Sequence, residues 1–148
     1  IPKDSSQVEH KFIEFLDNRS KKVSFYYKNG DSGAENFAVM RSDKQAAFYV
    51  DWIIKFNDGS IGLYDTKSGW TAEDAKTRAQ GLFEYILEEN NKGKNLTGGI
   101  VIPTKETLND IPALGHTGWL FHNGEDYFYN IDMNDQELKS YNWQDLYI

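Results

Sequence analysis

Apolar residues recur at helical spacing near the start of the chain. They lie three or four positions apart, at Val8, Phe12, Phe15 and Leu16. This spacing places side chains on one face of an α-helix, so we expect an amphipathic helix over residues 6–18. Glu9 shares a stripe with Ile13 and Leu16, which puts it at the edge of the apolar face. A carboxylate in that position is either a solvated edge residue or a functional one.

Strand patterns follow this first helix. Residues 23–27 are rich in aromatic and β-branched side chains, and Asn29-Gly30 is a turn signal. Residues 36–40 have the pattern of a second strand. We expect these two strands to pair with each other.

The most informative segment predicts two strands joined by a tight loop. Residues 48–56 and 60–69 carry the strand patterns, and the loop between them ends on Gly59. A glycine there can supply the left-handed residue of a bulged hairpin. The loop length then pairs Phe56 with Ser60 and determines the register of the whole hairpin.

This register gathers polar residues on one face of the hairpin. Asp51 lies opposite Asp65, and Tyr49 lies opposite Lys67. Directly opposed aspartates repel each other unless a cation or a proton lies between them. The other face of the first strand is expected to pack against the core through an unbroken apolar set: Phe48, Val50, Trp52, Ile54 and Phe56.

A second helix is expected after the hairpin, over residues 72–89. Thr71 and Asp74 have the spacing of a capping box at its start. The core stripe of this helix consists of Ala75, Ala79, Leu82, Phe83 and Ile86. Lys76 and Gln80 stand one turn apart beside the stripe. They either reach past the helix toward the sheet or are two surface residues.

The order of the remaining elements predicts a mixed sheet. Residues 98–103 form a continuous apolar run after the helix, which indicates a strand parallel to the one before the helix. Residues 119–121 and 127–131 flank an Asn123-Gly124 turn and predict a late hairpin. Three aromatic residues of the tail are expected to cover an edge of the core: Tyr141, Trp143 and Tyr147.

Length and composition indicate one domain. A chain of 148 residues, 39% of them hydrophobic, can bury one ordinary core. We expect a single domain over residues 1–148, with its core over residues 7–103 and a C-terminal hairpin and aromatic tail over residues 104–148. No apolar run reaches about 20 residues and no signal-peptide pattern is present, so we expect no membrane span and a cytoplasmic protein. The chain starts without Met, which is typical of a domain excised from a larger chain.

Charge and residue types narrow the function classes. The absence of cysteine excludes disulfides, thiolate metal sites and a cysteine nucleophile. The net charge of -7 argues against a protein that coats nucleic acid through a positive surface. One basic cluster is either a solvated loop or a phosphate contact: Arg19, Lys21, Lys22 and Lys28. The three histidines are scattered outside any metal or nucleophile motif and are expected to be structural: His10, His116 and His122.

The paired aspartates and the nearby lysine carry the candidate chemistry. Asp51 and Asp65 offer the hard oxygen ligands that Mg²⁺ prefers, and Lys67 directs an ammonium to the same place. A metal held in this way neutralises phosphate charge and lowers the pKa of a bound water, while a lysine can orient that water or stabilise developing charge. Phosphodiester hydrolysis requires these parts. The other interpretation is a surface ion pair of Asp65 with Lys67 or Lys55.

Several motifs together resemble the PD-(D/E)xK, or restriction endonuclease-like, superfamily. They are Glu9 in a first helix, YVDW around Asp51, and LYDTKSG with Asp65 and Lys67. More narrowly, VEHKFIEFL, YVDWIIKF, DTKSG and AKTRAQGLFEYI resemble the nuclease domain at the C-terminal end of type III restriction enzyme and related helicase subunits. The resemblance covers residues 7–103. It departs from the family pattern at Val50, where a proline is usual, and at the second acid, where Glu is commoner.

The resemblance implies an α/β (α+β) fold with a three-layer core, in which helices flank a mixed central β-sheet. It implies Mg²⁺ as the cofactor, with Mn²⁺ able to substitute, and DNA as the substrate. A helicase or translocase domain is implied in the same parent chain or complex.

The resemblance also implies roles for individual residues. The implied metal ligands are Asp51, Asp65, Thr66 and, through a water, Glu9. The implied catalytic lysine is Lys67, with Lys76 and Gln80 as accessory residues near the substrate phosphate or the attacking water.

We therefore expect a Mg²⁺-dependent DNA endonuclease domain that belongs to a larger chain. Two other hypotheses stay open. The first is a non-catalytic module that kept a degenerate nuclease fold and binds nucleic acid or a protein. The second is an enzyme that acts on RNA or a nucleotide. The sequence contains no recognition element for a particular DNA sequence and no indication of oligomeric state.

Overall fold

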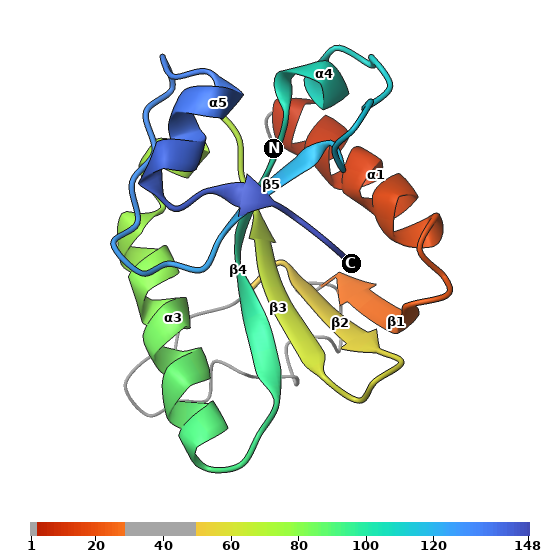
Figure 1. The fold of residues 1–148 in the computed structure, drawn as a ribbon, viewed down its shortest axis with the longest axis vertical. Coiled ribbons are helices and arrows are strands. Elements are labelled where there is room, and N and C mark those ends of the chain that lie inside the picture. The colour runs from red at the N-terminus through yellow and green to blue at the C-terminus, as the bar shows by residue number, and fades with distance from the viewer. Residues whose placement is uncertain (1–2, 29–49) are drawn as a thin grey trace.

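The described part of the chain folds around a six-stranded sheet (Figure 1). The computed structural model describes residues 3–28 and 50–148. Their elements are, in chain order, α1 (Lys3–Asp17), β1 (Val23–Lys28), β2 (Trp52–Phe56), β3 (Ile61–Thr66), α2 (Trp70–Glu73), α3 (Lys76–Asn91), β4 (Leu96–Pro103), α4 (Lys105–Leu108), β5 (Trp119–His122), α5 (Asp135–Leu138), the 3-10 helix η3 (Lys139–Tyr141) and β6 (Gln144–Asp145).

The strands lie in the sheet in the order of the sequence, from β1 to β6. β3 and β4 are parallel, and every other neighbouring pair is antiparallel. The parallel pair is joined through α3, because two parallel strands need a long connection from one end of the sheet to the other. The prediction of a mixed sheet is confirmed.

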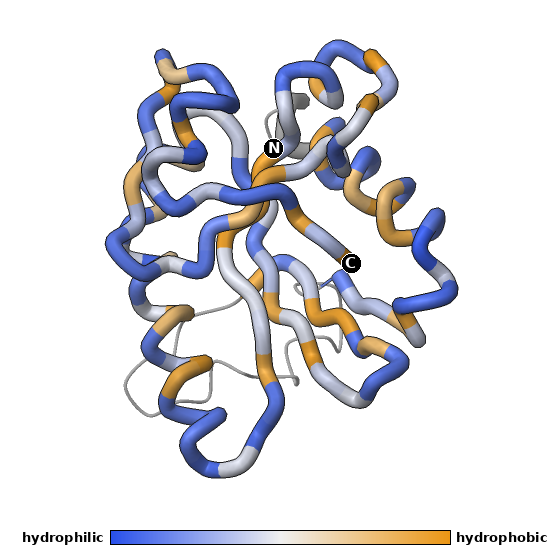
Figure 2. The backbone as a smooth tube through the Cα atoms, viewed as in Figure 1, coloured by the Kyte–Doolittle hydropathy of each residue, from blue (hydrophilic) through white to orange (hydrophobic). Residues whose placement is uncertain are grey.

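The β2–β3 hairpin has the predicted register. The N–H of Phe56 donates to the Ser60 carbonyl at 3.0 Å, and Trp52 is paired with Tyr64. Gly59 has a φ of 94°, the left-handed conformation that the tight loop requires. Figure 2 shows hydrophobic stretches along β2 and a hydrophilic turn between the two strands. The loop length therefore places the ends of both strands correctly.

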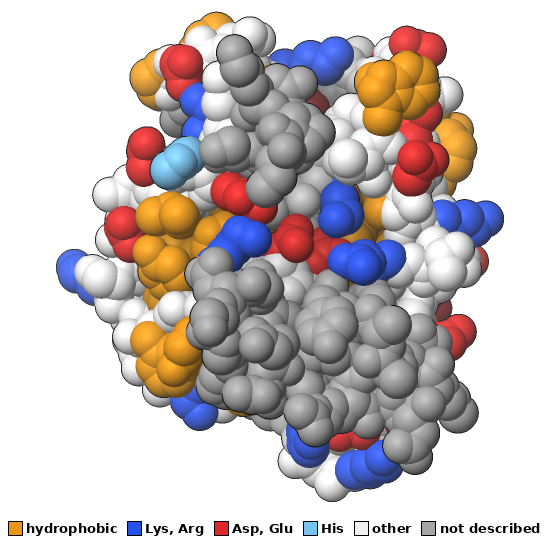
Figure 3. All heavy atoms as spheres, turned by 180° about the vertical axis from the view of Figure 1, so that it is seen from behind, with side chains coloured by type: hydrophobic (Ala, Val, Ile, Leu, Met, Phe, Trp, Pro, Cys, Tyr) orange, Lys and Arg blue, Asp and Glu red, His pale blue; other side chains and the backbone are white. Residues whose placement is uncertain are grey.

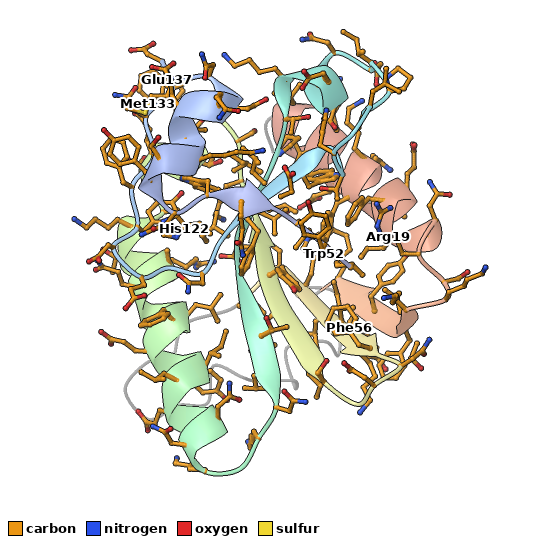
Figure 4. The ribbon with its side chains drawn as sticks, viewed as in Figure 1. Arg19, Trp52, Phe56, His122, Met133 and Glu137 are labelled. Carbon is orange, nitrogen blue, oxygen red and sulfur yellow. The ribbon has the colours of Figure 1, made fainter. Side chains whose placement is uncertain are left out.

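Both faces of the sheet are covered by helices, which gives three layers. On one face, the ring of Phe12 in α1 lies 5.3 Å from the ring of Trp52 and 5.1 Å from that of Trp119. Figure 4 shows Trp52 between α1 and the strands. On the other face, Leu82 of α3 packs in a cluster with Ile53 and other apolar strand residues. Successive residues of β2 thus contact opposite helical layers, so both faces of the strand are buried.

One prediction about the apolar face of β2 is wrong. Val50 does not share the face of Trp52 and Ile54; it packs with Ile53 and Leu82 on the α3 side. The chain bends at Asp51, and β2 begins only at Trp52. The alternation of side chains that holds within a strand therefore does not continue across the bend.

The predicted single helix over residues 72–89 is in fact two helices. α2 ends at Glu73, and α3 begins at Lys76 after a short turn. Thr71 does not cap the second helix, because its hydroxyl donates to the Ser68 carbonyl at 2.7 Å and accepts from the Ser68 N–H at 3.0 Å. The predicted buried stripe at Ala75, Ala79 and Leu82 is nevertheless present. Among the described residues, no helix is long and apolar enough to cross a membrane.

The prediction of a late hairpin is only partly right. Residues 119–121 lie in β5 as expected, but residues 127–131 form no strand. The partners of β5 are β4 and the short β6, whose Gln144 pairs with Phe121. Of the three tail aromatics, Trp143 is buried in the core, whereas Tyr141 and Tyr147 are exposed.

Two earlier expectations lie outside the described residues. They are the strand over residues 36–40 and the side chains of Phe48 and Tyr49 in the first strand of the hairpin. Within the described part, β1 pairs with β2 in antiparallel orientation.

Candidate active site

Asp51 and Asp65 meet where β2 begins and β3 ends. The backbone N–H of Asp51 donates to Oδ1 of Asp65 at 2.7 Å. In return, the backbone N–H of Thr66 donates to Oδ2 of Asp51 at 3.1 Å. Each carboxylate is therefore held by the backbone of the opposite strand, as the register predicted. The two acids need no long side chains to converge, because the hairpin itself places them.

Lys67 is directed at both carboxylates. Its Nζ lies 3.8 Å from Oδ2 of Asp65 and 4.0 Å from Oδ2 of Asp51. Its backbone N–H donates to the Val101 carbonyl at 2.9 Å, which continues the contact of β3 with β4 past the end of the strand. The three residues of the candidate chemistry thus come together at one point.

Asp65 is the buried member of the pair. Its side chain has an exposed fraction of 0%. Burial raises the pKa of Asp65 to about 6, and the charge of Asp51 adds to the increase, while Lys67 and Arg78 oppose it. The ion pair of Asp65 with Lys67 that the sequence left open is therefore present, but it is buried and does not lie at the surface. Among the described residues, Nζ of Lys55 is 3.5 Å from the Gly59 carbonyl and forms no ion pair with Asp65.

Arg78 is a site residue that the pattern reading missed. Its Nη1 lies 3.4 Å from Oδ2 of Asp65, so α3 supplies a second cation to the buried acid. Arg78 lies three residues after Ala75 and four before Leu82, on the stripe that faces the sheet. Its place on this stripe is the feature of the sequence that could have identified Arg78 as a site residue.

The two polar residues of α3 singled out from the sequence lie elsewhere. Lys76 is exposed and Gln80 is half-buried. Among the described residues, neither lines the cavity beside Asp51 or bonds to its carboxylates. Their accessory role stays a prediction.

A small cavity opens beside Asp51. It has a volume of about 200 Å³ and is lined by Val8, Glu9, Asp51, Thr66, Lys67, Ser68 and Thr71. Glu9 reaches it from α1 and pairs with Lys28, with Nζ and Oε2 3.2 Å apart. The edge carboxylate predicted from the first helix therefore faces the same hollow as Asp51 and Lys67.

The donor set fits a hard divalent cation that keeps part of its water shell. In the described part of the chain, no group of three or more histidine and acidic side chains converges as a complete ligand set. Mg²⁺, however, is commonly bound by one or two carboxylates together with waters and substrate phosphate. Asp51 and Asp65 supply two such carboxylates, and their mutual repulsion favours a cation between them.

The side chain of Thr66 contacts both a core tryptophan and Asp51. Its hydroxyl accepts a hydrogen bond from the Trp52 indole N–H at 3.1 Å and lies 3.4 Å from Oδ2 of Asp51. The buried side chain is therefore engaged in fixing Asp51 to the end of β3.

Larger hollows lie away from these acids. One of about 470 Å³ lies between α4 and the tail and includes Lys105, Asp135 and Lys139 in its lining. Another of about 410 Å³ includes Lys22, Phe56 and Tyr147. The first also contains acids beside a lysine, since Nζ of Lys139 lies 3.4 Å from Oδ1 of Asp145. Among the described residues, however, only Asp51 and Asp65 each accept a hydrogen bond from the backbone where the other acid is carried, so we assign the candidate chemistry to the smaller cavity.

The histidines lie outside the cavity beside Asp51. His10 is exposed on α1. Nδ1 of His116 accepts a hydrogen bond from the Gly118 N–H at 3.1 Å, and Nδ1 of His122 accepts one from the Gly124 N–H at 2.9 Å. The last two therefore fix loops, which agrees with the structural role expected from the sequence.

Charged side chains of both signs lie side by side near the centre of one face of the molecule (Figure 3).

Compared with protein-family models, curated proteins and solved structures, the chain matches none of them.

Proposed function

We propose that this chain is a Mg²⁺-dependent DNA endonuclease domain with a restriction endonuclease-like core of the PD-(D/E)xK kind. The convergence of Asp51, Asp65 and Lys67 at the end of one hairpin carries the proposal. A mixed sheet with a helical layer on each face supports it as well, because this is the layer order that the resemblance implies. The parent protein would include a helicase or translocase domain, as in type III restriction enzymes.

Each residue of the site has a task in phosphodiester hydrolysis. Asp51 and Asp65 would hold Mg²⁺, with Glu9 acting through a water; the bound metal would supply Lewis acidity toward the phosphate. Lys67 places its ammonium beside the same oxygens, where it orients the attacking water and stabilises negative charge as the phosphate becomes five-coordinate. Arg78 keeps Asp65 ionised and in position.

The first test is metal binding, because it requires no choice of substrate. Calorimetric titration of Mn²⁺ should show binding to the wild-type chain and none to the Asp51→Ala/Asp65→Ala double variant. Asp58→Ala is the matched control, since Asp58 is an exposed acid in the β2–β3 loop that accepts hydrogen bonds from Ser60. Equal binding by the wild type and the double variant would contradict the proposed site.

The second step of this test is DNA cleavage in Mg²⁺. Lys67→Ala and Asp65→Asn should each reduce the cleavage rate by at least about 100-fold, the typical effect of removing one charge-stabilising group. Lys55→Ala should cleave like the wild type, because Lys55 contacts the turn at Gly59 and not the site. Unchanged rates in both site variants would refute the nuclease assignment.

One observation favours a non-catalytic module as the second candidate. Lys67 and Arg78 already lie beside Asp65, so the pair of acids is partly compensated without a metal. The melting temperature in Mg²⁺ or Mn²⁺ separates the two candidates. A site that binds metal only in the folded state raises it, and a self-compensated ion cluster does not.

A further inference from the structure

One of the four tryptophans differs from the others in exposure. Trp52, Trp119 and Trp143 are buried, with exposed fractions of 0%, 2% and 2%. Trp70 is 71% exposed. A single exposed apolar residue is ordinary on a protein surface. An exposed indole beside a candidate phosphate site is a binding feature, because its face is free to stack.

Trp70 is attached closely to the site. It opens α2 three residues after Lys67, and three residues of chain span at most about 11 Å. The residues on either side of the Gly69-Trp70 step, Ser68 and Thr71, both line the cavity beside Asp51. The backbone hydrogen bond from Thr71 to the Ser68 carbonyl, 3.1 Å long, makes this connection a tight turn. Trp70 therefore lies next to residues that line the cavity, with its side chain exposed.

The surroundings of Trp70 suit nucleic acid better than a protein surface. Lys67 and Arg78 are the nearby cations that can face phosphate oxygens. Among the described residues, the apolar side chain found next to Gly69 is Ile131, which is half-buried, and one such neighbour is less than the extended apolar surface of a protein-docking patch. Aromatic side chains beside a basic groove are the usual means of binding single strands, because every base has a face that can stack.

We propose that Trp70 stacks on an unpaired base next to a phosphate that Lys67 faces beside Asp51 and Asp65, so that the substrate is single-stranded DNA or a frayed end. This inference rests on the proposed function for the position of the phosphate. In a duplex, base faces are covered by their neighbours, and a single surface indole cannot reach them without unstacking. Stacking also compensates for the weak electrostatic attraction expected of a chain with a net charge of -7.

The experiment uses the intrinsic fluorescence of the chain. Because the other three tryptophans are buried, quenching by added DNA reports on Trp70. We titrate the wild-type chain with oligothymidylate, and in parallel with a blunt duplex of equal length, in EDTA so that no cleavage occurs. We expect saturable quenching by the single strand and little by the duplex. Equal quenching by both, or none by either, overturns the inference.

Variants separate stacking from general surface contact. By fluorescence anisotropy of a labelled oligothymidylate, Trp70→Ala should bind between about 5-fold and 150-fold more weakly, which is the range for loss of one stacked base. Trp70→Phe should bind close to wild type while the quenching disappears. Tyr147→Ala is the control, because Tyr147 is 79% exposed and lines a different hollow. Wild-type affinity in Trp70→Ala overturns the inference.

This test and the test of the proposed function fail separately. The stacking experiment contains no metal, and the Mn²⁺ titration contains no DNA. Metal binding without Trp70 quenching refutes single-strand stacking alone. Quenching without metal binding refutes the nuclease site and leaves a single-strand binding module.

Discussion

At the scale of single residues, Asp65 is the most unusual group in the molecule. It is fully buried, and burial together with Asp51 raises its pKa to about 6. A carboxyl group must lose its proton before it binds a metal, so proton and cation compete for the same oxygens. The competition takes place in a pH range where ordinary aspartates are already ionised.

Metal affinity should therefore depend on pH below about 6. We expect the Mn²⁺ affinity to fall by about tenfold for each pH unit below the pKa of Asp65, because one proton is displaced per metal bound. Calorimetry at pH 5, 6 and 7.5 measures this dependence. In Arg78→Ala the fall should begin at a higher pH, since Arg78 opposes the rise of the Asp65 pKa. Constant affinity from pH 5 to 7.5 would contradict this prediction.

The site residues differ in how far the sequence predicts them. Asp51, Asp65 and Lys67 depend on hairpin register, which is a local property of the loop at Gly59 and carries over into three dimensions. Arg78 depends on how a helix packs across the sheet. In the sequence, a long charged side chain such as that of Arg78 suggests a surface position. Its small neighbours on α3, however, let the helix approach the sheet, which brings Arg78 to Asp65.

At the scale of elements, the close contact of β4 with β3 depends on a glycine. Gly98 is paired with Leu63 and has a φ of +147°. A Cβ on Gly98 would overlap the Leu63 carbonyl. Strand β4 can therefore approach β3 only because this position has no side chain. β3 ends with Asp65 and Thr66, so the site depends on the same approach.

Gly98→Ala should destabilise the fold strongly, by roughly 3 kcal/mol or more, because the overlap is with backbone and requires strands to move. Gly93→Ala is the matched control. Gly93 also has a positive φ, +99°, but open space surrounds its Cβ position, so only backbone strain of about 1 kcal/mol is expected. Denaturant unfolding of both variants measures the difference. Equal losses would show that the close strand contact is not important.

Sequence patterns predict helices and strands well where the pattern is local. They predict them poorly where tertiary contacts determine the conformation of the segment. The 3.6-residue period gives α1 and the buried stripe of α3. The bend at Asp51 turns Val50 to the opposite layer, which alternation alone does not reveal. Residues 127–131 have the composition of a strand. There, Tyr127 instead donates its hydroxyl to the Ala72 carbonyl at 2.7 Å, so side-chain packing replaces strand pairing.

At the scale of the whole molecule, the acidic C-terminal segment is part of the core. The ring of His122 packs against the rings of Tyr127 and Trp143, at centroid distances of 4.9 and 5.1 Å, and these two rings also contact each other at 5.7 Å. The indole N–H of Trp143 donates to the Phe128 carbonyl at 2.8 Å. Figure 4 shows His122 well apart from Trp52, on the side of the tail. A buried histidine thus joins the tail to the sheet.

The stability of the domain should depend on this histidine. Burial lowers the pKa of His122 from 6.5 to about 4. Between these values the unfolded chain binds the proton and the folded chain does not, so stability is fully present above pH 6.5 and is lost as pH falls toward 4. The loss between pH 7 and pH 5 should be about 2 kcal/mol. Urea unfolding at the two pH values measures it.

Asp65 contributes to the pH dependence of stability with the opposite sign to His122, so a variant is needed to separate the two contributions. Its pKa is raised in the folded state, and its contribution is present below 3.8 and lost as pH rises through 6. His122→Asn keeps an oxygen that can accept from the Gly124 N–H but does not titrate. The difference in pH dependence between wild type and His122→Asn isolates His122. Identical pH dependence in the two proteins would refute the prediction.

The sheet places its strands side by side in the order in which the chain is made. As each of the described strands leaves the ribosome, the earlier neighbour it pairs with has already been synthesised, so the sheet can grow from β1 toward β6 without waiting for the C-terminus. The site at the β2–β3 hairpin would then form early, and the last two-residue strand would close an edge that is otherwise open to other nascent chains. Translation itself would protect this fold from mispairing.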